Sequence, residues 1–80
     1  MKHIQYDIYV QLRFPGTWSF SIWKSIKPDG PAPKRIDWSD GWKDEEAALY
    51  HAGQALLAIQ ARDKIAHTDI EEAPQIRWLT

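Results

Sequence analysis

The 80-residue sequence contains no cysteine and only one methionine. Without cysteine the chain has neither a disulfide framework nor a thiolate metal site, and a composition of this kind suits a reducing compartment. No apolar run approaches the roughly 20 residues of a membrane-spanning helix. The N-terminal residues alternate as a strand does and do not read as a signal peptide. We therefore expect a soluble protein with a cytoplasmic location.

An excess of charge of either sign is also missing. Ten lysine and arginine residues stand against eleven aspartate and glutamate residues, and the formal net charge is -1. Proteins that are drawn to phosphate backbones by long-range attraction carry an overall positive field, so this balance counts against nucleic acid as the main partner. A chain this short makes one domain, 1–80, in which we expect a core over 1–64 and a C-terminal segment over 65–80.

Motifs for catalysis and for metal or cofactor binding are absent as well. His3, His51 and His67 lie far apart in the sequence, and none belongs to an HxxxH or HExxH pattern. No serine lies in a GxSxG elbow, and the four glycines do not form a phosphate-binding loop. We therefore predict that the protein is not an enzyme and that it binds no metal and no cofactor.

What the sequence does contain is a pair of alternating runs, Ile4 to Phe14 and Trp18 to Ile26, with a three-residue connection. This pattern predicts a β-hairpin. If Phe14 faces Trp18, the apolar residues of both strands share one face, with the pairs Leu12 and Phe20, Val10 and Ile22, and Tyr6 and Ile26. The same register sets Tyr9 opposite Trp23 on the other face.

A third strand is expected over about residues 34–39, after a loop at 27–33 that holds three of the five prolines. In this strand Ile36 and Trp38 should face the core, while Arg35 and Asp37 point away. Tryptophan is abundant, with five residues in the chain. The aromatic residues expected in the core are Phe14, Trp18, Phe20, Trp38 and Trp42.

A helix is predicted from about Glu45 to Lys64, with Asp44 as its N-terminal cap. An apolar stripe along it should lie on the sheet, and its members are Ala48, Leu49, Ala52, Ala55, Leu56 and Ile59. The last residues, 75–80, alternate again. They form a short fourth strand parallel to the first, a docked tail, or a segment exchanged with a second subunit. The predicted fold class is α+β, an antiparallel three-stranded meander packed on one helix.

The order of these elements, the W-x-F segment at Trp18 and the lead from Ser39 through Gly41 into an alanine-rich helix resemble the small bacterial YegP-like domains. The outline is also similar to the partial double-stranded-RNA-binding-like fold of HicB-type antitoxins. The resemblance covers about residues 6–58. It implies a β-β-β-α fold and carries over no activity and no site residue.

The best functional lead is the face of the sheet that one helix leaves open. The predicted partner-binding residues on this face are Tyr9, Gln11, Arg13, Trp23 and Arg35. We expect a small binding module that recognises a protein partner or forms a homodimer, such as a phage or mobile-element inhibitor of a host protein. The alternative is a nucleic-acid-binding module in which the two rings stack on bases and Arg13, Lys24, Lys27 and Arg35 contact phosphates. A purely structural role for the aromatic pair is a further alternative.

Overall fold

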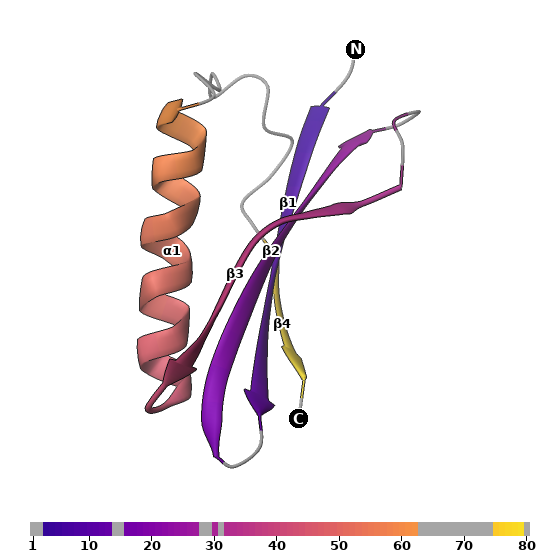
Figure 1. Cartoon of the computed structure of the whole chain (residues 1–80). Coiled ribbons are helices and arrows are strands. Elements are labelled where there is room, and N and C mark those ends of the chain that lie inside the picture. Colours follow the sequence, from indigo (N-terminus) through magenta and orange to yellow (C-terminus); the bar gives the residue numbers. More distant parts are fainter. Residues whose placement is uncertain (1–2, 14–15, 28–29, 31, 63–74, 80) are drawn as a thin grey trace.

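The computed structural model describes residues 3–13, 16–27, 30, 32–62 and 75–79. Within these residues the fold is α+β: a four-stranded sheet with one helix packed on one of its faces (Figure 1). The elements in chain order are β1 (His3–Arg13), β2 (Thr17–Lys27), β3 (Lys34–Trp42), α1 (Glu45–Arg62) and β4 (Gln75–Leu79). The strand order is β3-β2-β1-β4, so β3 and β4 form the two edges of the sheet.

The C-terminal segment forms a fourth strand, which is one of the three alternatives predicted from the sequence. β1, β2 and β3 pair in antiparallel fashion, whereas β4 runs parallel to β1, so the complete sheet is mixed and not an antiparallel meander. Figure 1 shows β1 and β4 pointing the same way on the far side of the sheet from β3. The predicted end of the helix at Lys64 lies outside the described residues.

The predicted register of the hairpin is wrong by two residues. Leu12 pairs with Trp18, and Val10 pairs with Phe20. The turn closes at Arg13, whose carbonyl accepts a hydrogen bond from the Gly16 amide at 2.7 Å, and Gly16 has a φ of +125° that only glycine adopts readily. Because side chains alternate with a period of two, this shift leaves every side chain on its predicted face.

The core lies between the sheet and α1. Its sheet side consists of Tyr6, Ile8, Val10, Phe20 and Ile22, and its helix side of Ala48, Ala52, Leu56 and Ile59. The two alanines have no exposed surface, which lets the helix approach the large side chains of the strands. Burial of each large apolar side chain stabilises the fold by about 1.5 to 3 kcal/mol.

The start of α1 is the one predicted from the sequence. Asp44 Oδ1 accepts a hydrogen bond from the Ala47 amide at 2.7 Å, which satisfies one of the free N–H groups of the first turn. Glu45 and Glu46 place negative charge at the positive end of the helix dipole, and Arg62 lies in the last turn.

The aromatic residues are distributed differently from the prediction. Trp18 and Trp42 pair across β2 and β3 and pack against the core, and Phe20 is buried, whereas Phe14 lies outside the described residues. The prediction for Trp38 is wrong, because half of its surface is exposed.

Trp38 is exposed because β3 contains a β-bulge. Asp37 pairs with Ile22, but the next pair along is Arg35 with Trp23, so Ile36 has no partner in the register. The extra residue interrupts the strict alternation of the strand. Arg35 and Trp38 consequently share the face away from α1, and Asp37 lies opposite the buried Ile22.

Candidate functional site

The face of the sheet that α1 does not cover, called the open face below, presents two rows of side chains that cross all four strands. The first row consists of Arg77, Tyr9, Ser21 and Trp38, in the order β4, β1, β2 and β3. The second row consists of Gln75, Asp7, Trp23 and Arg35 in the same strand order. Three aromatic rings and two guanidinium groups therefore occupy adjacent positions.

Tyr9 and Trp23 lie diagonally across the hairpin and not directly opposite each other as predicted. Tyr9 pairs with Ser21, and Trp23 pairs with Asp7. The two rings still meet, with centroids 6.1 Å apart and planes inclined by 33°, because diagonal neighbours on one face of a hairpin are within reach of aromatic side chains. The indole Nε1 of Trp23 donates a hydrogen bond to Ser21 Oγ at 3.0 Å, which fixes the orientation of the ring.

Each of the two arginines from the outer strands lies over a ring of the first row. The Cζ atom of Arg77 is 6.0 Å from the ring centroid of Tyr9, and that of Arg35 is 5.8 Å from the ring of Trp38. Contacts of this kind at exposed sites are worth about 0.5 to 1 kcal/mol. Arg77 also donates from Nη2 to Gln75 Oε1 at 2.8 Å. The guanidinium groups are thereby held beside the aromatic rings, where a partner would meet both together.

The five residues predicted for this site all belong to the open face by register. Tyr9 and Trp23 are half-buried at its centre, and Arg35 is exposed in β3. Gln11 and Arg13 are exposed further along β1, opposite Ser19 and Thr17. The structure brings Arg35 to the aromatic rings and leaves Gln11 and Arg13 toward the hairpin end.

Sequence reasoning missed Trp38 and Arg77. Trp38 was assigned to the core because the bulge at Ile36 has no signature in the sequence, and strict alternation was the natural assumption. Arg77 lies beside Tyr9 because β4 pairs with β1 in a register that nothing in the sequence signals.

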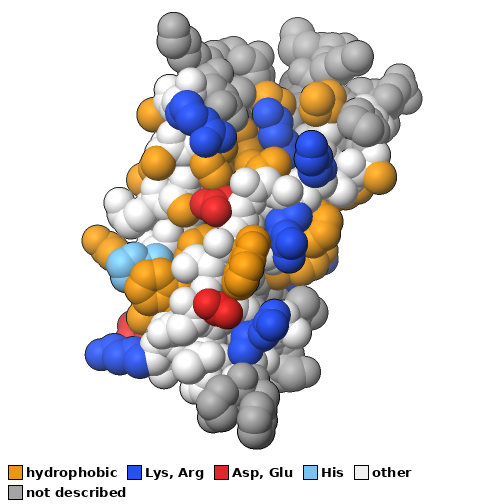
Figure 2. All heavy atoms as spheres, viewed as in Figure 1, with side chains coloured by type: hydrophobic (Ala, Val, Ile, Leu, Met, Phe, Trp, Pro, Cys, Tyr) orange, Lys and Arg blue, Asp and Glu red, His pale blue; other side chains and the backbone are white. Residues whose placement is uncertain are grey.

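Charge is unevenly distributed over the two sides of the sheet. The open face carries Arg13, Arg35 and Arg77 together with the carboxylate of Asp7, which accepts a 3.5 Å hydrogen bond from Gln5 Nε2. On the side of the molecule shown in Figure 2, basic side chains in blue extend from top to bottom, with hydrophobic groups and acidic side chains exposed between them. The open face thus gathers three arginine side chains in a chain whose formal net charge is -1.

Lys24 does not join this basic set. Lys24 pairs with the buried Tyr6, so register places it on the side of the sheet that carries α1. The side chain of Lys27 lies outside the described residues.

The described residues offer neither a metal-binding cluster nor a membrane-spanning helix. No group of three or more histidine, cysteine, aspartate or glutamate side chains there could hold a metal ion. His51 stacks on Trp42, with ring centroids 3.8 Å apart and planes 12° apart, and meets the edge of the Tyr50 ring. The described helix is not long and apolar enough to cross a membrane.

Comparison with known proteins gives no matching family model, no similar curated protein and no similar solved structure. The resemblance to YegP-like domains and to HicB-type antitoxins therefore stays a prediction from the sequence. The functional argument depends on the open face itself.

Proposed function

We propose that the chain is a non-catalytic binding module that docks another protein chain through the open face, with Tyr9 and Trp23 at the centre of the contact. The partner is a second copy of the chain or a foreign protein. A cysteine-free sequence suits such a module in the cytoplasm.

The contact between Tyr9 and Trp23, with an arginine over Tyr9 and a second over the adjacent Trp38, carries this proposal. Aromatic and arginine side chains are the groups most enriched at the energetic centres of protein interfaces. A pair that only stabilises the hairpin needs the two rings of β1 and β2 and nothing more. The ring and guanidinium groups of β3 and β4 extend the surface well beyond such a pair.

Light scattering coupled to size-exclusion chromatography, over a concentration series, tests the proposal and identifies the kind of partner. The wild type is compared with the double variant Tyr9→Ala/Trp23→Ala, and circular dichroism verifies that both are folded. A wild-type dimer that becomes a folded monomer in the variant identifies the partner as a second copy. A wild-type monomer leaves a foreign protein as the partner. A dimer that persists in the folded variant contradicts docking through these rings.

A nucleic-acid-binding module is the second candidate, and a specific feature of the open face favours it. Three rings lie in two adjacent rows with Arg35 and Arg77 beside them. Single-stranded nucleic acids bind to surfaces that combine stacking rings with positive charge, because every base presents a flat aromatic face. The near-neutral charge of the whole chain favours the protein partner over this candidate.

Fluorescence anisotropy of a labelled single-stranded oligonucleotide distinguishes the two candidates. Binding of nucleic acid should weaken steeply between low and moderate salt, because phosphate contacts release counterions. Arg35→Ala should weaken it further, whereas Lys24→Ala, a basic residue on the opposite side of the sheet, serves as the matched control. Absence of binding at low salt would remove this candidate.

A further inference from the structure

A second surface lies on the opposite side of the sheet, where α1 stops short of β4. The helix packs on β1, β2 and β3. Register places Ile76 and Trp78 of β4 on the same side as the helix, opposite the buried Ile8 and Val10. Nevertheless 45% of Ile76 and 48% of Trp78 is exposed, so this part of the apolar layer is only partly covered.

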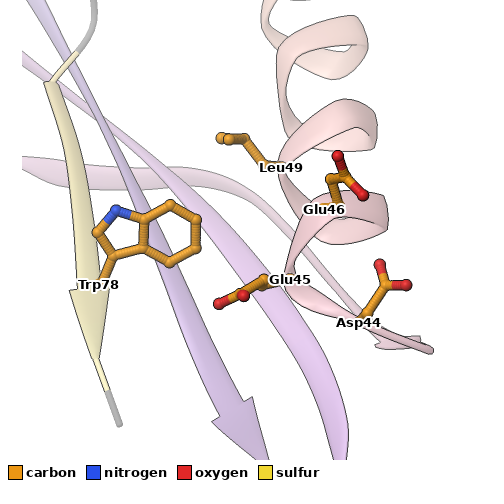
Figure 3. A pocket seen from close by; sticks show the side chains of 5 residues that line it. All are labelled: Asp44, Glu45, Glu46, Leu49 and Trp78. Atoms are coloured by element: carbon orange, nitrogen blue, oxygen red, sulfur yellow. The ribbon is translucent and has the colours of Figure 1, made fainter.

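A groove of about 450 Å³ separates Trp78 from the first turns of α1. The residues that line it are Asp44, Glu45, Glu46, Leu49 and Trp78. Figure 3 shows the indole of Trp78 and the carboxylate of Glu45 extending toward each other from β4 and α1, with Leu49 above them. The groove thus combines an apolar wall on each side with carboxylates at one end.

No lysine or arginine is among the described residues that line the groove, although three carboxylates are. Asp44 already accepts the capping hydrogen bond of the helix. Glu45 and Glu46 are exposed. An occupant that is both apolar and positively charged is the one that complements this lining, since an indole face also attracts cations.

The backbone of β4 supplies the second element of the surface. β4 is the last strand of the sheet, so one of its edges has no neighbouring strand in the described part of the chain. The other edge strand, β3, contains two register irregularities, which make it a poor template for pairing, whereas the β4 register is continuous. An extended peptide can add to an edge of this kind through main-chain hydrogen bonds.

We propose that β4 and the adjoining groove bind an extended cationic segment of a partner protein, which adds to the sheet as a fifth strand. Alternate side chains of that segment lie on the helix side of the sheet, next to Trp78. There an apolar side chain contacts the indole of Trp78, and an arginine or lysine extends across it toward Glu45 and Glu46. This site lies on the opposite side of the sheet from the open face and does not depend on the function proposed for that face.

The probe is a dye-labelled heptapeptide with arginine, leucine and arginine at its second, fourth and sixth positions and threonine elsewhere. Fluorescence anisotropy at low salt measures its affinity for the full chain. Binding should be saturable, and the same peptide with both arginines changed to glutamate should not bind. In nuclear magnetic resonance spectra the peptide should shift the amide signals of Ile76 to Trp78 and the indole signal of Trp78, and not the indole signal of Trp38.

Two sets of variants separate the groove from the rest of the surface. Glu45→Gln/Glu46→Gln should weaken binding by about tenfold, the loss expected for two exposed ion pairs. Trp78→Ala should weaken it by at least about tenfold, as for the central aromatic residue of an interface. Trp38→Ala is the matched control for Trp78, because 50% of Trp38 is exposed, on the opposite side of the sheet. Asp40→Asn, an exposed carboxylate of β3, is the control for the glutamates.

The proposal is overturned if the arginine peptide gives no saturable binding. It is also overturned if the glutamate peptide binds equally well, or if the folded Glu45→Gln/Glu46→Gln variant keeps wild-type affinity. Because these two glutamates are exposed, their replacement keeps the fold and the test remains decisive even if Trp78→Ala unfolds the chain. The variant Tyr9→Ala/Trp23→Ala removes the two central rings of the open face and should leave the affinity for the peptide unchanged. The two proposals can therefore fail separately.

Discussion

Tyr9 and Trp23 meet diagonally across β1 and β2, with their ring centroids 6.1 Å apart. A diagonal pair on one face of a sheet stabilises the fold by about 0.2 to 1 kcal/mol. A double-mutant cycle with Tyr9→Ala, Trp23→Ala and the double variant should therefore give a coupling free energy of about 0.5 kcal/mol in denaturant unfolding. The pair Tyr9 and Ser19, which lies on the same face without a ring contact, provides the control cycle. A coupling energy above about 2 kcal/mol would instead make the pair a main structural element.

Close packing of α1 on the sheet depends on small side chains. Ala52 has no exposed surface, so Ala52→Leu should overpack the core and lower the free energy of unfolding by about 1 to 3 kcal/mol. The same change at the exposed Ala58 should alter it by no more than about 0.5 kcal/mol. Urea denaturation measures both. Equal effects at the two positions would contradict the helix orientation described here.

Gly41 and Gly53 should respond to alanine with opposite signs. Gly41 ends the bulged part of β3 with a φ of +87°, a left-handed conformation that costs an L-residue about 1 to 2 kcal/mol. Gly53 lies within α1, and a Cβ atom built there has no neighbour within 4 Å. Gly53→Ala should therefore raise the free energy of unfolding by about 0.5 to 1 kcal/mol. Thermal melts of the two variants measure this difference. A Gly41→Ala variant that is more stable than the wild type would contradict the left-handed conformation of Gly41.

His51 contributes to stability through the contact of its ring with Trp42. The ring stacks on Trp42 at a centroid distance of 3.8 Å, so His51→Ala should lower stability by about 0.5 to 1.5 kcal/mol. His51→Phe retains a ring at the same position and should restore most of that loss in chemical denaturation. If phenylalanine destabilises the protein as much as alanine does, the stacking interaction is not the source of the effect.

Much of the fold was accessible from the sequence because hydrophobic alternation and helix capping are local signals. The faces of Val10 and Phe20 and the cap at Asp44 follow from residue spacing alone, and the structure confirms them. The hairpin register was not accessible, because it depends on which residue takes the left-handed conformation in the turn. Gly16 and the Arg13 carbonyl decide it.

The candidate site was found in part for the same physical reasons. Tyr9 and Trp23 were placed on the open face by alternation, which is insensitive to a shift of two residues. Trp38 was misplaced because a bulge moves one residue out of the alternation without any change in composition. The position of Arg77 beside Tyr9 is a long-range pairing between the two ends of the chain, which periodicity within a segment does not encode.

Site-specific photocrosslinking in cells tests docking through the open face most directly. A photoreactive amino acid replaces Gln11, an exposed position of the open face, and in a separate variant Gln54, an exposed position of α1. We expect a discrete protein adduct from position 11 that disappears when Tyr9→Ala/Trp23→Ala is added, and no such adduct from position 54. The adduct mass distinguishes a second copy from a foreign protein. An identical adduct from both positions, or none from position 11, would contradict the account.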